Sequence, residues 1–158
     1  MIRSAVYKRA HEMNTHGRHI KVLGRGTPSK LGDAKAVEKM LVDLIDILGM
    51  RMLDKAHIYD VEVEIEKLGK TPFEDEGGVT GVCVLSTSHC SIHTWPVRPF
   101  FVMDVYSCRD FDPREVEAFL QDRMGGYDLQ VTDVSAALEY KFENSPVRPE
   151  PGVYTGNA

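Results

Sequence analysis

The sequence predicts an α+β fold in which two helices cover one face of a mostly antiparallel sheet. Two segments carry apolar residues at helical spacing, and six shorter segments have the apolar or alternating pattern of strands. Their order is strand, helix, four strands, helix, strand, which makes a two-layer domain. The second face of the sheet also carries apolar positions, so we expect a homodimer that stacks two sheets into an αββα sandwich.

The first half of the chain supplies a strand, the longer helix and a second strand. Residues 1–16 are polar and mixed and are expected to be a lead-in, and residues 18–24 form a strand followed by turn residues at 27–29. A helix is predicted over 33–48, with Asp33 as N-cap and Gly49 as its stop. Residues 57–66 alternate strictly and predict a strand with one wet, acidic face. That face carries Asp60, Glu62, Glu64 and Glu66.

The second half is richer in strands. We expect a loop over 67–78, strands at 79–85 and 91–95 with a sharp break near Ser86–Ser88 between them, and a central strand at 100–106. Asp112-Pro113 with Glu115 predicts a helix start, and Gly125-Gly126 its end. A last strand spans 127–134. The predicted organisation is one domain over 1–158, with a core at 17–135 and a loosely ordered tail at 136–158.

Composition limits the function classes. The net charge is −5 and the pI about 5.7, so we expect neither a nucleic-acid nor a membrane partner. The sequence has no run of 18 apolar residues and no signal-peptide core, which predicts a cytoplasmic protein. The three cysteines are expected to be free thiols rather than a disulfide framework.

The stretch from Ser86 to Trp95 combines two imidazoles, a thiol and several hydroxyls between strand-like runs, as a reaction centre requires. One interpretation is a metal site made by His89, Cys90 and His93, with another cysteine nearby. Alternation along a strand would point Cys90 away from both histidines, and no second pair of ligands such as C-x-x-C is present. We therefore expect no metal.

Two further chemistries fit this stretch. In a hydrolase, Ser88 or Cys90 would be activated by a histidine, but the G-x-S-x-G elbow is absent and no orienting acid is identifiable. In a self-cleaving protein, the Ser88 hydroxyl would attack the carbonyl of Thr87 and the serine would end as a pyruvoyl group. Composition alone leaves the choice open.

The motif S-H-x-x-I-H-T-W-P at 88–96, with Cys108 twenty residues after the serine, closely resembles the bacterial and archaeal class of S-adenosylmethionine decarboxylase proenzymes. Agreement extends to Gly17-Arg18-His19 and to Gly78-Val79-Thr80-Gly81, and it covers about residues 17–135. Members of this family have α+β protomers that dimerise through their sheets.

The resemblance implies a self-processing decarboxylase of polyamine biosynthesis. Cleavage between Thr87 and Ser88 would convert Ser88 into a covalent pyruvoyl cofactor, which forms a Schiff base with a small-molecule amine substrate and draws electrons from its α-carbon. His93 would shuttle the proton during processing, and Thr80 stands where the family usually has an assisting serine. Cys108 would reprotonate the product. The active species would be a homodimer of cleaved protomers.

Two positions depart from the family pattern, and both concern substrate binding. Val97 replaces the glutamate that usually holds the ribose hydroxyls, and hydroxyls buried against valine would each go unpaired at a cost of about 1–3 kcal/mol. The family also has an aromatic residue that stacks on adenine. An ungapped count back from Ser88 places that position at Glu74, with Phe73 adjacent. Trp95 is a further candidate for substrate contact, although a core role competes with it.

Three functions therefore remain open. The leading one is decarboxylation of S-adenosylmethionine, with other residues making the contacts to the ribose. The second is decarboxylation of arginine or ornithine, whose cationic group would face Glu74, Asp75 or Glu76. The third is a homologue that does not process and has no enzymatic activity.

Overall fold

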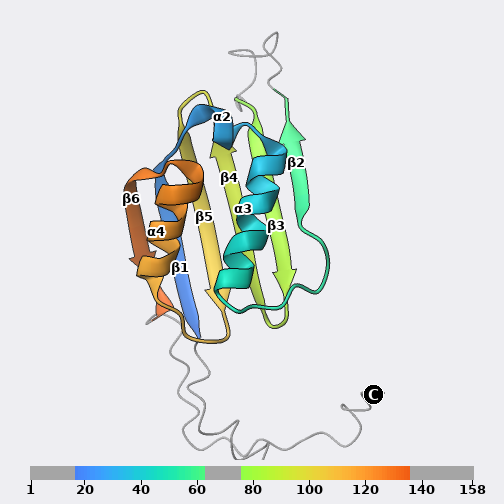
Figure 1. Ribbon diagram of the computed structural model, residues 1–158, viewed down its shortest axis with the longest axis vertical. Helices are drawn as coiled ribbons and strands as arrows, with labels where there is room; N and C mark the ends of the chain where they lie inside the picture. The colour runs from blue at the N-terminus through green and yellow to red at the C-terminus, as the bar shows by residue number, and fades with distance from the viewer. Residues whose placement is uncertain (1–16, 63–75, 136–158) are drawn as a thin grey trace, which may run out of the picture.

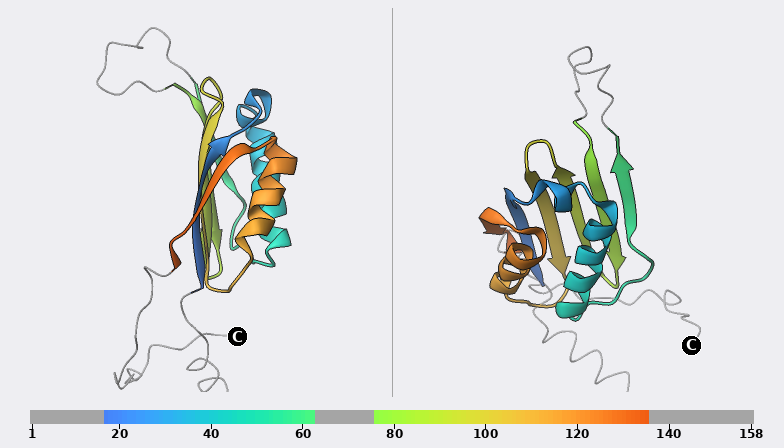
Figure 2. Two further views of the ribbon diagram at one scale, coloured as in Figure 1. Left: turned by 90° about the vertical axis from the view of Figure 1, so that its left-hand side faces the viewer. Right: turned by 45° about the horizontal axis from the view of Figure 1, so that its top comes forward.

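The computed structural model describes residues 17–62 and 76–135 and contains one antiparallel sheet with helices on one face (Figures 1 and 2). The strands are β1 Arg18–Arg25, β2 His57–Val61, β3 Gly78–Leu85, β4 Ser88–Trp95, β5 Phe100–Ser107 and β6 Tyr127–Asp133. The helices are α2 Pro28–Leu31, α3 Ala34–Ile47 and α4 Pro113–Met124. The six strands lie in the order β2-β3-β4-β5-β1-β6. The predicted two-layer α+β class is confirmed.

Both long helices begin and end as their sequences predict. The Asp33 side chain accepts hydrogen bonds from the backbone N–H groups of Lys35 and Ala36, and Asp112 caps α4 in the same way. Gly125 ends α4 in the left-handed conformation at φ 60°, which glycine adopts at little steric cost. The short helix α2 was not predicted, because proline in a turn and proline in a first helical turn have the same fixed φ.

The core lies between the helices and the sheet. Gly81 in β3 allows this layer to close, since a Cβ there would lie 2.6 Å from the Leu41 side chain of α3. The largest fully buried residues include Phe101, Ile20, Leu41, Leu44, Ile92, Met103 and Leu120. They come from three strands and both long helices, so the sheet positions are fixed by one continuous core.

Two strand boundaries differ from the sequence prediction by more than one residue. β4 begins at Ser88 rather than at residue 91, because Leu85 pairs with Ser88 and only Ser86 and Thr87 form the turn. Pairing with a neighbour on each side makes this polar segment a strand despite its weak intrinsic preference. β2 ends at Val61, and the continuation expected at 63–66 lies outside the described residues. Asp60 and Glu62 are exposed, as expected.

The other face of the sheet carries no helix in the described part of the chain (Figure 2). Several of its residues are apolar and only half-buried, and they occupy the strands at the centre of the sheet. They include Leu23, Val82, Trp95, Phe100, Val102 and Tyr106. No helix among the described residues is long and apolar enough to cross a membrane.

Replacing Thr94 by valine should test how β4 is held against the helices. Thr94 is 3% exposed, donates through Oγ1 to the carbonyl of Leu31 at 2.8 Å and accepts from the N–H of Val79 at 2.8 Å. Thr94→Val keeps the shape of the side chain but leaves the Leu31 carbonyl and the Val79 N–H without this partner. The free energy of unfolding should fall by about 1–3 kcal/mol for each of these two groups. Urea unfolding at equal protein concentration measures this.

The matched control is Thr132→Val in β6, where the threonine is exposed and the change should stay within about 0.5 kcal/mol. Equal losses in the two variants would contradict the role assigned to Thr94.

Candidate active site

Ser88 and Cys108 meet where the β3–β4 hairpin lies beside the end of β5. The backbone N–H of Cys108 donates to Ser88 Oγ at 3.0 Å, and Thr87 Oγ1 donates to Cys108 Sγ at 3.1 Å. Residues about twenty positions apart come together because β4 and β5 pair antiparallel, with His89 opposite Tyr106. A hydroxyl, a thiol and the 87–88 peptide bond are therefore in one place.

The backbone of Thr87 is strained. Its φ is 60°, in the left-handed region that a β-branched residue rarely adopts. Such a conformation costs on the order of 1–3 kcal/mol and persists only where the surroundings enforce it. Here the two-residue turn between paired Leu85 and Ser88 enforces it. The strain lies in the residue whose carbonyl precedes Ser88.

A cavity of about 240 Å³ adjoins this junction. The chain segment after α3 forms one wall, and the hairpin turn and the end of β5 form the other. Its lining residues are Gly49, Met50, Arg51, Ser86, Thr87, Ser88, Ser107, Cys108 and Arg109. The cavity is lined by both hydroxyl and cationic groups and is large enough for a small polar group beside Ser88.

The three thiols differ in their ionisation. Hydrogen bonding from Thr87 lowers the pKa of Cys108, partial burial opposes this, and Ser88 and the Arg109 cation lower it further. Burial raises the pKa of Cys83 to about 11 and raises that of Cys90 as well. Cys108 is the one of the three that is not fully buried. It is therefore the thiol suited to proton transfer.

Thr80 and His93 form a second group on the helix-free face. Thr80 Oγ1 lies 3.0 Å from Nδ1 of His93, and the two residues are register partners in β3 and β4. His93 is five residues from Ser88 along β4, about 17 Å at strand rise, and strand alternation turns their side chains to opposite faces. One chain therefore does not bring His93 to Ser88.

The candidate substrate residues lie at the other end of β4. Trp95 stacks on Phe100 with ring centroids 5.7 Å apart, and these rings line a cavity of about 320 Å³ together with an ion pair between Glu76 and Arg98. Val97 follows in the turn and is 74% exposed. Phe73, Glu74 and Asp75 lie outside the described residues.

The histidines and Cys90 do not form the metal site considered from the sequence. Cys90 lies opposite Cys83 in the β3–β4 register, on the helix-covered face, and both are free thiols. His89 and His93 lie on the other face. His89 instead joins His19 and Asp104, a cluster that sequence reasoning missed. Burial raises the pKa of Asp104, but hydrogen bonds from the two histidines outweigh it, and the net shift is downward.

Comparison with known proteins identifies the family of this chain. A family model described as S-adenosylmethionine decarboxylase matches residues 18–136. The chain belongs to the S-adenosylmethionine decarboxylase family. The resemblance seen in the sequence motif is thereby confirmed, and the chain is a member of a family of decarboxylases.

Relatives within this family come from archaea and bacteria. The S-adenosylmethionine decarboxylase proenzyme of Methanococcus maripaludis strain C7 is 37% identical over 129 residues, which cover 80% of this chain and 93% of the relative. The proenzyme of Geobacillus sp. strain WCH70 is 32% identical over 127 residues, covering 80% and 91%.

A solved structure matches at the level of the fold. The crystal structure of the adenosylmethionine decarboxylase from Aquifex aeolicus VF5 superposes with a TM-score of 0.58 at 22% identity. The match covers 77% of this chain and 90% of that chain. The family fold is therefore that of the sheet and helices described above.

The pH dependence of alkylation should separate Cys108 from the other thiols. Because the pKa of Cys108 is lowered, its reactive thiolate should persist to lower pH, with a midpoint below the ordinary value of 9.0. Thr87→Val removes the hydrogen bond from the hydroxyl and should move that midpoint upward. Iodoacetamide labelling of the intact chain, followed peptide by peptide in a mass spectrometer, gives the profile.

Cys83 provides the internal control, since it is fully buried and its pKa is raised to about 11, so it should stay unlabelled in the folded chain over the pH range in which Cys108 reacts. A Cys108 midpoint at or above 9.0, or one that Thr87→Val leaves unchanged, would contradict the assigned hydrogen bond.

Proposed function

We propose that this chain is a self-processing, pyruvoyl-dependent decarboxylase of polyamine biosynthesis, with S-adenosylmethionine as its substrate. The observation that carries the proposal is the junction of Ser88 and Cys108 at the strained Thr87–Ser88 bond. Family membership supports the reaction class, and the relatives' name, proenzyme, supports processing.

Processing would begin with the Ser88 hydroxyl. Its oxygen attacks the carbonyl carbon of Thr87, the amide C–N bond breaks, and an ester joins Thr87 to Ser88 Oγ. Loss of the Ser88 α-proton then expels the Thr87 carboxylate and leaves dehydroalanine at position 88. Hydrolysis releases ammonia and leaves a pyruvoyl group at the new N-terminus. Backbone strain at Thr87 favours the first step, because the strained peptide is lost in it.

The residues around Ser88 fit the group that would form there. The cavity of about 240 Å³ offers room, and the Cys108 N–H already contacts the serine oxygen. A pyruvoyl group supplies an electron sink for the carbon that loses carbon dioxide. Cys108 would donate the proton that replaces the lost carboxylate. A thiol with a lowered pKa suits that task, because acid catalysis is most efficient near the working pH.

The active species we propose is a homodimer. Ser88 and Cys108 lie at one end of the sheet, whereas the Thr80–His93 pair lies on the helix-free face, about 17 Å along β4. Two sheets stacked face to face would bring the Thr80–His93 pair of one chain to the turn of its partner that contains the Thr87–Ser88 bond. The half-buried apolar residues of that face supply the contact area. Each site would then contain residues of both copies.

A basic amino acid is the second candidate substrate. Val97 has no acceptor for ribose hydroxyls and is 74% exposed, which favours a smaller amine such as arginine or ornithine. Against this, the one described member of the acidic patch, Glu76, already pairs with Arg98. S-adenosylmethionine is therefore the leading candidate substrate, because the relatives are named S-adenosylmethionine decarboxylase proenzymes.

The first experiment is intact-mass measurement on the aged, purified protein. We expect two fragments, 1–87 and 88–158, with the second blocked at its N-terminus. Ser88→Ala should remain a single 17.7 kDa chain, because the attacking oxygen is gone. Ser91→Ala, a serine in the same strand, should cut normally. An uncut wild-type chain would support the non-processing homologue instead.

The cut protein is then assayed for release of carbon dioxide from S-adenosylmethionine, arginine and ornithine in parallel. Release from S-adenosylmethionine alone supports the leading proposal, and release from either amino acid replaces it with the second.

Mixing two inactive variants should test the shared site. His93→Ala alone should stay uncut, and Ser88→Ala cannot cut. When the two variants are co-expressed, each heterodimer should contain one complete processing site, with Ser88 from one chain and His93 from the other. The His93→Ala chain should then be cut, and its 88–158 fragment is recognised by its mass. If that chain stays uncut in purified heterodimers, His93 does not act across the interface.

A further inference from the structure

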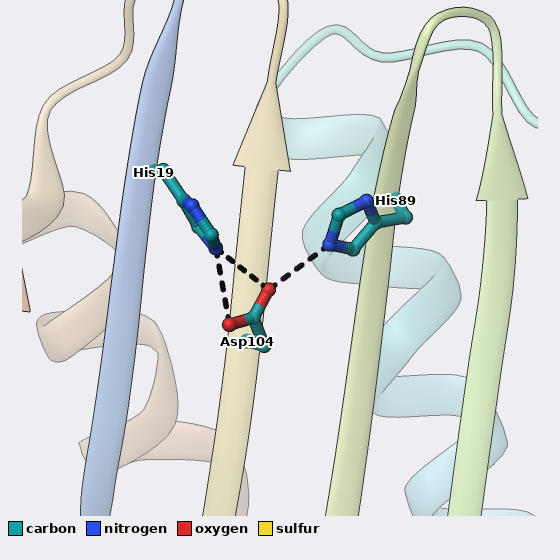
Figure 3. A group of neighbouring side chains, drawn as sticks. All are labelled: His19, His89 and Asp104. Atoms are coloured by element: carbon teal, nitrogen blue, oxygen red, sulfur yellow. Dashed lines mark hydrogen bonds and ion pairs between the residues drawn. The ribbon is translucent and has the colours of Figure 1, made fainter. Parts of the chain in front are cut away.

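The cluster of His19, Asp104 and His89 brings three metal-ligand groups together on the helix-free face (Figure 3). Nε2 of His19 lies 2.9 Å from Oδ1 of Asp104 and 3.0 Å from Oδ2, and Nε2 of His89 lies 3.0 Å from Oδ1. One donor atom from each of the three residues lies within 4.8 Å of the others. We infer that this cluster is a binding site for a divalent metal ion of the zinc class.

Backbone register fixes this arrangement. The three residues come from three neighbouring strands, β1, β5 and β4, and His19 and His89 both pair with Tyr106 of the strand between them. Asp104 is two residues from Tyr106 and therefore on the same face. Tyr106 packs against both imidazoles, with ring centroids 5.6 Å apart in each case. The rings are held by the sheet itself rather than by a loop, which favours a preorganised site.

The donor set selects the kind of ion. Two imidazole nitrogens and one carboxylate oxygen are ligands that zinc, cobalt and nickel accept, whereas magnesium and calcium prefer oxygen alone. Bonds of about 2.0–2.1 Å in tetrahedral geometry separate ligand atoms by roughly 3.3 Å. The present spacings from Asp104 to the imidazoles are 2.9–3.0 Å, within a few tenths of an ångström of that separation, and the two imidazole nitrogens lie within 4.8 Å of each other. Three protein ligands leave a fourth position for water.

Other groups near the cluster do not block it. Lys21 Nζ lies 3.9 Å from Oδ2 of Asp104, on the oxygen that does not contact His89, and its side chain is 55% exposed and can turn away. The side chain of His89 is 50% exposed in the single chain, so an ion can reach the cluster before two chains stack through this face. His93 lies four residues further along β4, about 13 Å away, and is not a fourth ligand.

Zinc binding by tag-free protein, stripped with a chelator and dialysed, tests the inference. Titration with zinc chloride in a calorimeter should give one site per chain, with much weaker response to magnesium chloride. Asp104→Asn and His89→Ala should each weaken zinc binding by about tenfold or more. Cobalt should give the visible absorption of a low-symmetry nitrogen–oxygen site, and that signal should be lost in both variants.

The matched control is His57→Ala. His57 also pairs with a carboxylate, Asp54 at 3.0 Å, but it has no third ligand group beside it in the described structure. This variant should bind zinc as the wild type does. Circular dichroism checks that each variant is folded. If His89→Ala does not fold, Asp104→Asn, which keeps the side-chain shape, is the decisive variant.

The same titration is repeated in Ser88→Ala, so that the result does not depend on the proposed processing. One zinc per chain, lost in Asp104→Asn and kept in His57→Ala, supports the site in cut and uncut protein alike. Zinc binding that Asp104→Asn leaves unchanged, or that disappears when Cys108 is replaced by serine, would overturn it.

Discussion

The pairing of β4 with β3 on one side and β5 on the other is the constraint on which the rest of this structure depends. Strand side chains alternate with a period of two, so the register decides which residues face the helices and which face away. Cys90, Ile92 and Thr94 are buried under the helices, and His89 and His93 lie on the open face. A slip of one residue would exchange the two sets, burying imidazoles and exposing the core.

The same register places the reactive groups. Pairing to β5 brings Cys108 to Ser88, and pairing to β3 brings Thr80 to His93. Because Ser88 is the first residue of β4 and His93 is its sixth, these two contacts lie apart on one chain. The sheet thus holds two groups with different chemistry, a hydroxyl beside a thiol and a hydroxyl beside an imidazole. In the proposed homodimer, a second copy of the chain would unite them.

The sequence predicts well whatever depends on local chemistry. The caps at Asp33 and Asp112 and the stop at Gly125 fix the long helices, and the apolar run at 100–106 indicates an interior strand, as the order of strands confirms. The start of β4 was predicted three residues too late, because Ser88, His89 and Cys90 become strand only through pairing. The positive φ of Thr87 likewise has no sequence signal, since threonine disfavours it.

The cluster at Asp104 lies further beyond the reach of sequence patterns. His19 and Asp104 are 85 residues apart and meet only because β1 pairs with β5, a contact that no local spacing encodes. Their one sequence signal was that both belong to segments that resemble the family. Short-range patterns reveal a nucleophile beside its turn, but a ligand set drawn from three strands requires the order and register of the sheet.

The distance between the two ends of β4 also bears on how substrate choice can change in this family. The proposed processing would take place between Thr87 and Ser88 at the hairpin end, whereas Val97 lies in the turn at the other end of β4, between Trp95 and Arg98 in the sequence. Trp95 and Arg98 both line the cavity at that end. Val97 is 74% exposed, so replacing an acidic residue there costs the core nothing. Under the proposed function, a change of substrate would therefore arise at one end of the strand while the Thr87–Ser88 turn at the other end keeps its geometry.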